Sequence, residues 1–398
     1  MAMSQRAFPP ELLTQAAATR LAYFKACTIA HPRLQAVDQA LREAIREPTG
    51  ALLIFFYGPT GVGKTTVLQR RRQQIIEEQR PEMERDSGWV PIVGIEAIAP
   101  ERGDFNWRDY YMDALRAFDE PLIHRKISNP EPPPARGSPA QYIPRRIDSR
   151  SVLRVALESA IRQRRPLAFL VDEAQHLAKI AGGRKLQDQL DCLKSLAIRT
   201  QTVHVLAGTY DLLILRQLSG QLSRRTRHIH FARYRADAAE DVRDFQNVLW
   251  NFQIRMPLAA EPDLLRHWEF CYERSLGCVG LLKEWLTRTL AAGLAQKTPQ
   301  VTLRLLEQQA LALADCQKIA TEMLEGEAIL AEADGTQKRL RTLLAFADAP
   351  APGTRPTAAA GTSRPTTAPR PPTTRVGERT PTRDPVGVAG RIGEEHTR

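Results

Sequence analysis

A glycine-rich turn that follows an apolar run constrains the fold more than any other part of this sequence. Residues 52–57 read LLIFFY, which is typical of a buried parallel strand. The turn and the start of a helix-compatible segment follow it and match the pattern G-x-x-x-x-G-K-T of a phosphate-binding P-loop in full. These residues are Gly58, Pro59, Thr60, Gly61, Val62, Gly63, Lys64, Thr65 and Thr66.

The residue types of this turn suit a nucleoside triphosphate. Gly61 and Gly63 let the backbone curl, so that successive N–H groups point inward at phosphate oxygens. A helix that begins at Lys64 adds the positive end of its dipole to the same cradle. We expect Lys64 to reach the β- and γ-phosphates and the Thr65 hydroxyl to be a ligand of Mg²⁺. The sequence therefore predicts that residues 58–66 bind ATP together with Mg²⁺.

Two carboxylates follow a second apolar run, roughly a hundred residues after the P-loop. Residues 167–171 read LAFLV, which indicates a central strand covered on both faces, and Asp172 and Glu173 come directly after it. In this position Asp172 would hold Mg²⁺, through a water molecule, and Glu173 would polarise the attacking water. The alternative is a pair of solvated carboxylates at the end of a strand.

Two weaker signals lie further along the core. Thr209 follows a short strand at 203–208, where its side chain can lie between the two motifs and sense the γ-phosphate or position the water; a turn-forming threonine is the alternative. Arg224 and Arg225 precede a late strand at 227–231. At this edge of the domain either arginine could stabilise transition-state charge on the nucleotide of a neighbouring subunit. A solvated basic turn or a DNA contact explains them nearly as well.

Beyond Ala236 the pattern is helical only, up to about residue 346. Gly280 at a helix start, with Lys283 one turn in, could bring a cation to the phosphates from a lid, although an ordinary surface lysine is an equal alternative. The last fifty residues are rich in Pro, Thr, Ala, Gly and Arg and lack the apolar surface to offset their ordering entropy. The chain is therefore divided into an N-terminal helical segment at 1–48, an α/β core at 49–235, a lid with C-terminal helices at 236–346, and a disordered tail at 347–398.

The net charge and the cysteine content indicate which kind of binding partner and which cellular compartment to expect. The net charge of +11 and the pI near 9.7 favour a polyanionic partner. The five cysteines show no C-x-x-C spacing and are interpreted as reduced thiols. The first twenty residues contain no apolar signal core, and no run is long enough to cross a bilayer. We expect a cytoplasmic protein with no membrane partner.

Taken together, the motifs of residues 10–320 resemble the AAA+ ATPases, and in detail the TniB/TnsC-type ATPases of bacterial transposons. The detailed likeness rests on four stretches, which are His31-Pro32, residues 103–108 (GDFNWR), residues 171–176 (VDEAQH) and residues 206–209 (LAGT). The resemblance implies a bacterial, ATP-dependent regulator that forms a ring or helical filament on double-stranded DNA. Such a protein marks the target site, recruits or activates a transposase and works with target-selection proteins. It also implies that the His31 region lies near the adenine.

The sequence departs from this family in two places. Shorter members lack the long Pro/Thr/Arg tail, and members with extensions use them to contact transposase or targeting subunits. At the position of Lys283 many AAA+ relatives have arginine. This difference puts the role of Lys283 as a second sensor in question.

An oligomer on DNA needs only one or two phosphate contacts per subunit, because repetition supplies the affinity. By analogy with the AAA+ architecture, loops on the pore-facing side provide these contacts. A solvated basic loop is an equal alternative for any one arginine. The sequence has no helix-turn-helix and no zinc-ligand spacing, so we expect binding without sequence specificity. The candidates are Arg102, Arg145, Arg146 and Arg150.

The predicted fold is an α/β P-loop fold with a parallel five-stranded sheet, helices on both faces and a C-terminal helical lid. We expect the P-loop strand at the centre, flanked by the strands that precede Asp172 and Thr209. The predicted reaction is slow ATP hydrolysis, with ATP favouring assembly and hydrolysis favouring release. Two other classes stay open: a helicase-loader or replication-initiator ATPase, and a signalling switch ATPase that binds no DNA.

Overall fold

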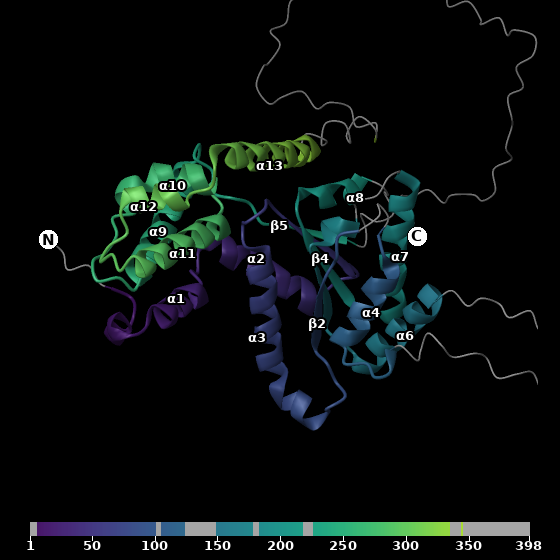
Figure 1. Cartoon of the computed structure of the whole chain (residues 1–398). Coiled ribbons are helices and arrows are strands. Elements are labelled where there is room, and N and C mark those ends of the chain that lie inside the picture. The colour runs from purple at the N-terminus through teal and green to yellow at the C-terminus, as the bar shows by residue number, and fades with distance from the viewer. Residues whose placement is uncertain are drawn as a thin grey trace, which may run out of the picture. The chain divides into compact units, whose positions relative to one another are not determined.

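The computed structural model describes residues 6–100, 105–123, 149–177, 183–217, 226–334 and 344. The chain divides into two compact units, Met1–Arg339 and Leu340–Arg398, and all of the described residues except Leu344 belong to the first. Figure 1 labels helices and strands of the first unit.

The N-terminal helices contact two different parts of the unit. A 3-10 helix, η1 (Pro10–Thr14), and helix α1 (Ala17–Ala26) precede α2 (Pro32–Arg46). The break before α2 follows from its first residue, since proline is tolerated at a helix start and His31 caps the helix from outside. Helix α1 contacts α11 (Val279–Ala295), whereas α2 contacts strand β5 (Thr226–His230) and helix α3 (Lys64–Arg85).

Five parallel strands form one sheet, in the order β2-β3-β4-β1-β5. Strand β1 comes directly before the P-loop, and β3 and β4 come directly before the predicted catalytic positions. The remaining bounds are β1 (Leu53–Tyr57), β2 (Ile92–Glu96), β3 (Ala168–Asp172) and β4 (Val203–Gly208). All residues of β1 and β4 are buried, as expected of inner strands of a parallel sheet.

The predicted strand order was wrong in one respect. The P-loop strand β1 lies between β4 and β5, and the strand of Asp172, β3, pairs with β4 and β2 instead. The central strand is therefore β4, not β1. The physical reason is that an apolar run reports burial on both faces, which β1, β3 and β4 share, and carries no information about which strand is the neighbour. The parallel five-stranded sheet itself was predicted correctly.

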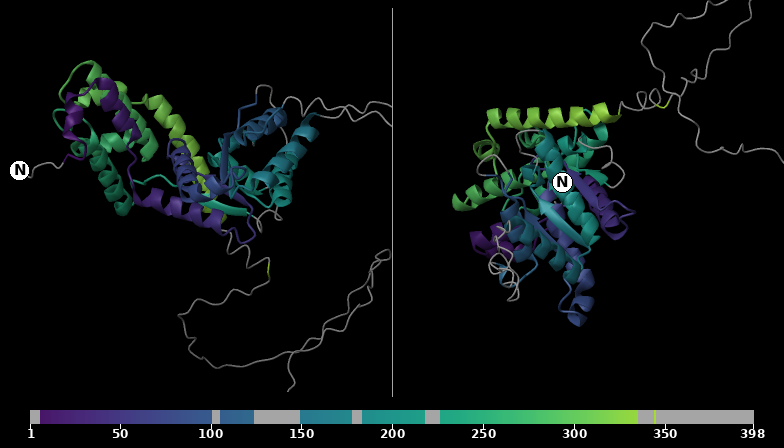
Figure 2. Two further views of the ribbon diagram at one scale, coloured as in Figure 1. Left: turned by 90° about the horizontal axis from the view of Figure 1, so that it is seen from below. Right: turned by 90° about the vertical axis from the view of Figure 1, so that its right-hand side faces the viewer.

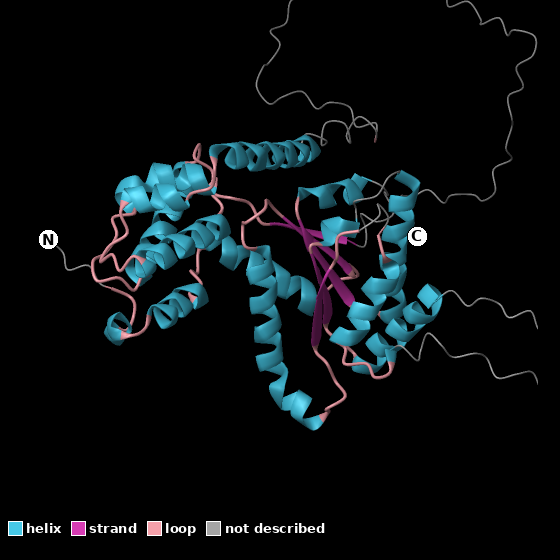
Figure 3. Cartoon of the chain, viewed as in Figure 1, coloured by secondary structure: helices cyan, strands magenta, loops and turns pink. Residues whose placement is uncertain are grey.

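Helices cover both faces of this sheet, with the strands between α3 and a group of three helices (Figure 3). Helix α3 contacts β2, β3 and β4, and the group is held together by contacts of α6 with α4 and α7. The bounds are α4 (Trp107–Ala117), α6 (Ser149–Arg164) and α7 (Gly183–Thr200). Three short helices follow strand ends, namely η2 (Ala174–Leu177), η3 (Tyr210–Leu212) and α8 (Leu213–Gln217).

The lid helices have a hydrophobic core of their own. Trp285 and Leu290 of α11 pack there with Phe252 of α9, and Phe24 of α1 joins them with its ring 6.0 Å from that of Phe252. The N-terminal helix α1 is thus part of the lid core, which the sequence did not predict. The lid elements are α9 (Ala239–Arg255), η4 (Leu265–His267), α10 (Trp268–Ser275), α11 and α12 (Leu303–Gln309). The domain boundaries at 48, 235 and 346 stay predictions.

After the lid, helix α13 (Leu313–Asp334) returns to the core (Figure 2). Met323 of α13 is buried in the main hydrophobic cluster together with sheet residues. Gly326 lies against the ring of Tyr210 in η3, and Glu327 forms an ion pair with Arg233, Nε to Oε1 2.9 Å. Helix α13 therefore lies across the end of the sheet at which β4 ends.

Two general expectations can be compared with the described residues. All five cysteines are free thiols, and Cys271, Cys278 and Cys316 are buried. Within the described ranges no helix combines the length and apolar character needed to cross a membrane.

Candidate nucleotide site

The P-loop has the backbone that its glycines predict. Gly61 and Gly63 adopt positive φ angles of 73° and 115°, which side-chain-bearing residues rarely adopt, and Gly63 forms the N-cap of α3. A Cβ atom at Gly58 would overlap the carbonyl oxygen of Phe231. The loop therefore depends on three glycines, two for their φ angles and one for a close approach of the chain after β5.

Lys64 points back into this loop. Only 8% of the residue is exposed, and its Nζ donates hydrogen bonds to the carbonyl oxygens of Gly58 (3.0 Å) and Pro59 (2.9 Å). Burial lowers the pKa of Lys64, while the negative charges of Glu173 and, more weakly, Asp172 act in the opposite direction. The fold therefore brings the predicted phosphate-binding lysine within electrostatic reach of the predicted catalytic residue Glu173 and the predicted metal ligand Asp172.

The two carboxylates lie where β3 ends. Asp172 is the last residue of β3, and its Oδ1 accepts a hydrogen bond from the backbone N–H of Glu173 at 2.9 Å. Glu173 has φ of +52°, a left-handed conformation that costs a non-glycine residue about 1 kcal/mol or more. Backbone strain of this kind persists only where the surrounding structure holds it in place, and it is often found at functional sites. The left-handed conformation bends the chain directly after β3.

Thr209 lies between the two motifs, as the sheet order requires. It follows β4, and β4 separates β1 from β3. The Thr209 Oγ1 is buried and has no hydrogen-bond partner within the described part of the chain, while its backbone N–H donates to Oε1 of Gln175 at 3.2 Å. An unpaired buried hydroxyl beside the P-loop fits a polar ligand at this place. Thr209 as the γ-phosphate sensor stays a prediction that this geometry supports.

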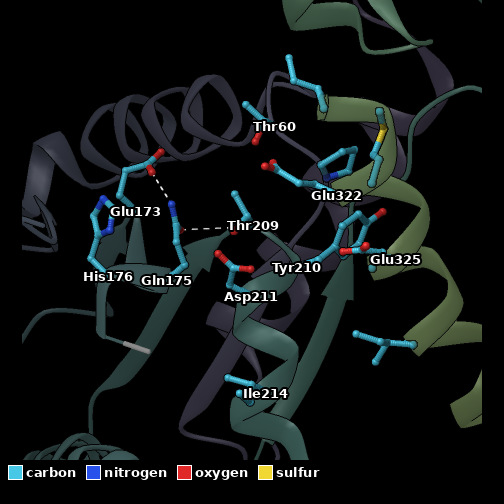
Figure 4. Close-up of a pocket in the computed structure, with 15 residues that line it drawn as sticks. Thr60, Glu173, Gln175, His176, Thr209, Tyr210, Asp211, Ile214, Glu322 and Glu325 are labelled. Carbon is cyan, nitrogen blue, oxygen red and sulfur yellow. Dashed lines mark hydrogen bonds between the residues drawn. The ribbon is translucent and has the colours of Figure 1, made fainter. Parts of the chain in front are cut away.

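A cavity of about 890 Å³ opens beside these residues (Figure 4). Its core side is formed by the P-loop, the end of β3 and η3, and its other side by α13. Carboxylates line it from both sides, Glu173 and Asp211 from the core and Glu322 and Glu325 from α13. The other lining residues are Pro59, Thr60, Gln175, His176, Thr209, Tyr210, Ile214, Ile319, Met323, Gly326 and Ile329.

The donor set at the P-loop suits Mg²⁺. Thr65 and Asp172 offer hydroxyl and carboxylate oxygens, the hard ligands that Mg²⁺ prefers, and Mg²⁺ commonly takes its remaining ligands from phosphates and water. Across the described ranges, no cluster of three or more His, Cys, Asp or Glu side chains could hold a metal by itself. The oxygens of Thr65 and Asp172 are of the kind that would hold Mg²⁺ bound to a nucleotide.

His31 lies between the N-terminal helices and the chain after β5. Its Nδ1 accepts a hydrogen bond from the backbone N–H of Leu34 (3.4 Å) and lies 2.9 Å from the hydroxyl of Tyr234, and its ring stacks on that of Phe231. Burial lowers the pKa of His31 to about 4, so the ring is neutral at pH 7. Phe231 itself lies against Gly58, which places His31 one side chain from the P-loop. Its role near the adenine stays a prediction.

The structure does not bring Lys283 to the phosphate loop. Its Nζ donates to the carbonyl oxygen of Lys25 at the end of α1, at 2.8 Å. The contact of α11 with the P-loop is made two residues earlier, where the N–H of Leu281 donates to the carbonyl oxygen of Gly61 at 2.9 Å. Lys283 lies two residues further, rotated by about 200° around the helix. The spacing from Gly280 was correct for one helical turn, but Leu281 faces the loop instead.

The remaining predicted site residues fall mostly outside the described part of the chain. Arg150 is described and lies exposed in the first turn of α6. Strand β5 begins with Thr226 paired to Leu53 at the start of β1, so the chain enters β5 at the edge opposite the P-loop. The residues outside the described ranges are Arg102, Arg145, Arg146, Arg224 and Arg225.

The sequence did not reveal two contacts, that of Gln175 in the site and that of Arg233 with α13. Gln175 bonds both Glu173 and Thr209, and Arg233 pairs with Glu327 and donates to the hydroxyl of Tyr272 at 3.1 Å. Gln175 stands within the carboxylate motif, so its position could have drawn notice. Arg233 carries no local signal, because its partner lies on a helix almost a hundred residues away.

Comparison with known proteins gives one domain assignment. The family model described as AAA domain matches residues 46–215. No curated protein matches the sequence.

Several solved structures are similar in part. The Aeropyrum pernix ORC2 protein is 14% identical, with a TM-score of 0.43 over 70% of this chain and 67% of that one. The Aeropyrum pernix ORC1 protein in complex with DNA is 14% identical, with a TM-score of 0.46 over 74% and 68%. The Thermotoga maritima RuvB Holliday junction branch migration motor is 12% identical, with a TM-score of 0.37 over 70% and 67%.

These TM-scores are low, so the assignment rests on the domain model and on the site. The matched residues include the P-loop, the carboxylates after β3 and Thr209, which the sheet brings to one edge. Residues 46–215 of this chain form an AAA-type ATPase domain with the AAA+ P-loop fold, and the reaction of this domain is ATP hydrolysis.

Proposed function

We propose that this protein is an ATP-dependent regulator of DNA transposition that assembles on double-stranded DNA as a ring or helical filament. In this role it binds DNA without sequence preference, marks a target site and recruits or activates a transposase. ATP favours the assembled form, and hydrolysis favours release.

The observation that supports the ATP-dependent part most directly is the meeting of three sequence motifs at one sheet edge. Lys64, the carboxylates of Asp172 and Glu173, and Thr209 come from three adjacent strands, and two of these motifs belong to the stretches that resemble TniB/TnsC-type ATPases. We assign ATP and Mg²⁺ to residues 58–66 and Asp172, and the activation of water to Glu173.

The DNA-binding part is supported by charge. A net charge of +11 creates a field that attracts a polyanion, and a protein that repeats along DNA needs few contacts in each copy. Arg150 is an exposed cation on the first turn of α6 and is our candidate among the described residues. We propose Arg102, Arg145 and Arg146 as further contacts.

A replication-initiator or helicase-loader ATPase is the second candidate. Proteins of this kind usually carry a DNA-binding module after the lid. In the described residues that follow α12 there is one helix, α13, which packs on the ATPase core. The resemblance of the motifs favours the transposition regulator.

The test is binding to a long duplex of random sequence with ATP, a non-hydrolysable analogue, ADP or no nucleotide. Negative-stain imaging of the same samples reports rings or filaments. Lys64→Ala removes the cation that the P-loop needs, and Lys25→Ala is its control because Lys25 is exposed at the end of α1. We expect ATP-dependent assembly on DNA in the wild type and in Lys25→Ala, and none in Lys64→Ala.

Two results would contradict parts of the proposal. Absence of DNA binding in every nucleotide state would remove the target-marking role and favour a signalling switch that binds no DNA. Assembly that persists in Lys64→Ala would separate DNA binding from the nucleotide.

A further inference from the structure

The side chain of Gln175 joins two groups of the site. Its Nε2 donates a hydrogen bond to Oε2 of Glu173, and its Oε1 accepts one from the backbone N–H of Thr209 at 3.2 Å (Figure 4). Glu173 follows β3 and Thr209 follows β4, so a single amide connects the ends of two adjacent strands.

The chemistry of the two partners fixes the orientation of this amide. A carboxylate only accepts hydrogen bonds and a backbone N–H only donates them, so the amide cannot be flipped without losing both. Gln175 is 5% exposed, and a buried amide without partners costs free energy. The Gln175 amide can therefore make both hydrogen bonds in one orientation only.

The neighbouring backbone leaves room for this arrangement. A Cβ atom at Gly208 would overlap Oε1 of Gln175, so the last residue of β4 must be glycine for the amide to reach Thr209. Glu173 is in a strained left-handed conformation and its side chain is held by this amide. Strain of this kind persists only where neighbouring contacts hold it.

We propose that Gln175 is a positioning residue for ATP hydrolysis, which holds the Glu173 carboxylate at a fixed place relative to the end of β4. The inference rests on the assignment of Glu173 as the residue that activates water. Gln175 touches neither nucleotide nor water in this role. It sets the distance between the carboxylate and Thr209, and displacement of a reacting group by about 1 Å costs roughly a hundredfold in rate.

Two substitutions separate the hydrogen bonds from the space that the side chain fills. Gln175→Met removes both hydrogen bonds at nearly constant volume. Gln175→Glu can still accept from the Thr209 N–H but places a second carboxylate against Glu173, and like charges at this distance repel. Both variants should lower kcat.

Gln253 of the lid provides a matched control. It is also buried, its Nε2 donates to Oε1 of Glu261 at 2.7 Å and its Oε1 accepts from the N–H of Leu264 at 2.8 Å. The substitutions Gln253→Met and Gln253→Glu break the same kinds of contact inside the lid. Any loss that comes only from a broken buried amide should appear in these variants too.

Steady-state kinetics with MgATP, with and without duplex DNA, distinguish positioning from structure. For both Gln175 variants we expect kcat to fall by about tenfold or more, with KM and the dissociation constant for ATP within about twofold of wild type. The Gln253 variants should keep kcat. Unchanged kcat in Gln175→Met and Gln175→Glu would overturn the inference, as would equal losses of kcat in the Gln253 variants.

A double-mutant cycle tests the contact without turnover. Denaturation midpoints of Glu173→Ala, Gln175→Met and the double variant should be non-additive, because the two side chains interact in the free protein. Additive shifts would contradict the contact itself. The variant Glu173→Gln distinguishes the role of Glu173 from the positioning role of Gln175. If Glu173→Gln keeps ATP hydrolysis, Glu173 does not activate water. If Glu173→Gln loses hydrolysis and the Gln175 variants hydrolyse ATP normally, only the positioning role is refuted.

Discussion

The packing of α13 on the ATPase core can be tested at a single glycine. A Cβ atom at Gly326 would lie no more than 2.5 Å from three atoms of the Tyr210 side chain. The Tyr210 ring is 7% exposed, and its hydroxyl lies 2.9 Å from Nε2 of His230, so the ring is held on both sides. In Gly326→Ala, the helix must therefore move away from η3.

The size of the effect follows from three contributions. Alanine is favoured over glycine in a helix interior by about 1 kcal/mol. Overpacking against a fixed ring costs about 1–3 kcal/mol. Moving the helix also weakens the pair of Arg233 and Glu327, whose side chains are 15% and 18% exposed, and uncovers part of Met323. Together these contributions give a net loss of about 1–3 kcal/mol in the free energy of unfolding.

Thermal and urea denaturation measure this loss, and Gly293→Ala is the control. Gly293 also lies inside a helix, α11, but its Cβ would meet only Oγ1 of Thr298 at 3.2 Å and Cδ2 of Leu305 at 3.4 Å. These contacts are tight by only a few tenths of an ångström, so we expect Gly293→Ala to stay within about 1 kcal/mol of wild type. At roughly 2–4 °C per kcal/mol, Gly326→Ala should lower Tm by several degrees. Equal stability of the two variants would refute the argument that α13 is seated against Tyr210.

Two further predictions concern the lid and the sheet. In Gly280→Ala the new Cβ would overlap the carbonyl oxygen of Gly61, so α11 cannot keep its contact with the P-loop. Isothermal titration should show about tenfold weaker ATP binding, or about 1.4 kcal/mol. Unchanged affinity for ATP would contradict a role of this contact. His204 is fully buried in β4, and burial lowers its pKa to about 4. Below pH 6.5, the ordinary pKa of histidine, the unfolded chain binds a proton on His204, whereas the native state binds it only near pH 4. The free energy of unfolding therefore falls as the pH drops from about 6.5 to about 4, by up to about 3 kcal/mol. Urea denaturation of His204→Leu between pH 7 and 4.5 should show a shallower loss than wild type, and identical slopes would contradict the assignment.

Local pattern was sufficient for the elements that carry the chemistry. Strand β4 spans Val203–Gly208, as its apolar run predicts. The P-loop is defined by glycine spacing, which is a local property of the backbone. For these elements the sequence was a good guide because burial and turn chemistry act over a few residues.

The missed features depend on contacts between distant residues. Nothing within β1 indicates that it pairs with β4 and β5, and nothing within α11 indicates that Lys283 lies beside Lys25. In the sequence Gln175 does not differ from any other polar residue in a short helix, because its role depends on where β4 ends. Ion pairs such as that of Arg233 with Glu327 connect residues 94 positions apart. Such pairings follow from the folded arrangement and have no signature in a short window.

The strand order has a consequence for the synthesis of the chain. Strand β1 pairs only with β4 and β5, whose residues begin at 203 and 226, so the P-loop strand has no partner when it leaves the ribosome. At roughly 5–20 residues per second, this delay is on the order of 10 s. During it, the sequence LIFFY offers two open edges and no charge, which are features of segments that aggregate. A nascent chain arrested before β4 would therefore contain the entire P-loop motif and yet lack both strands that pair with β1.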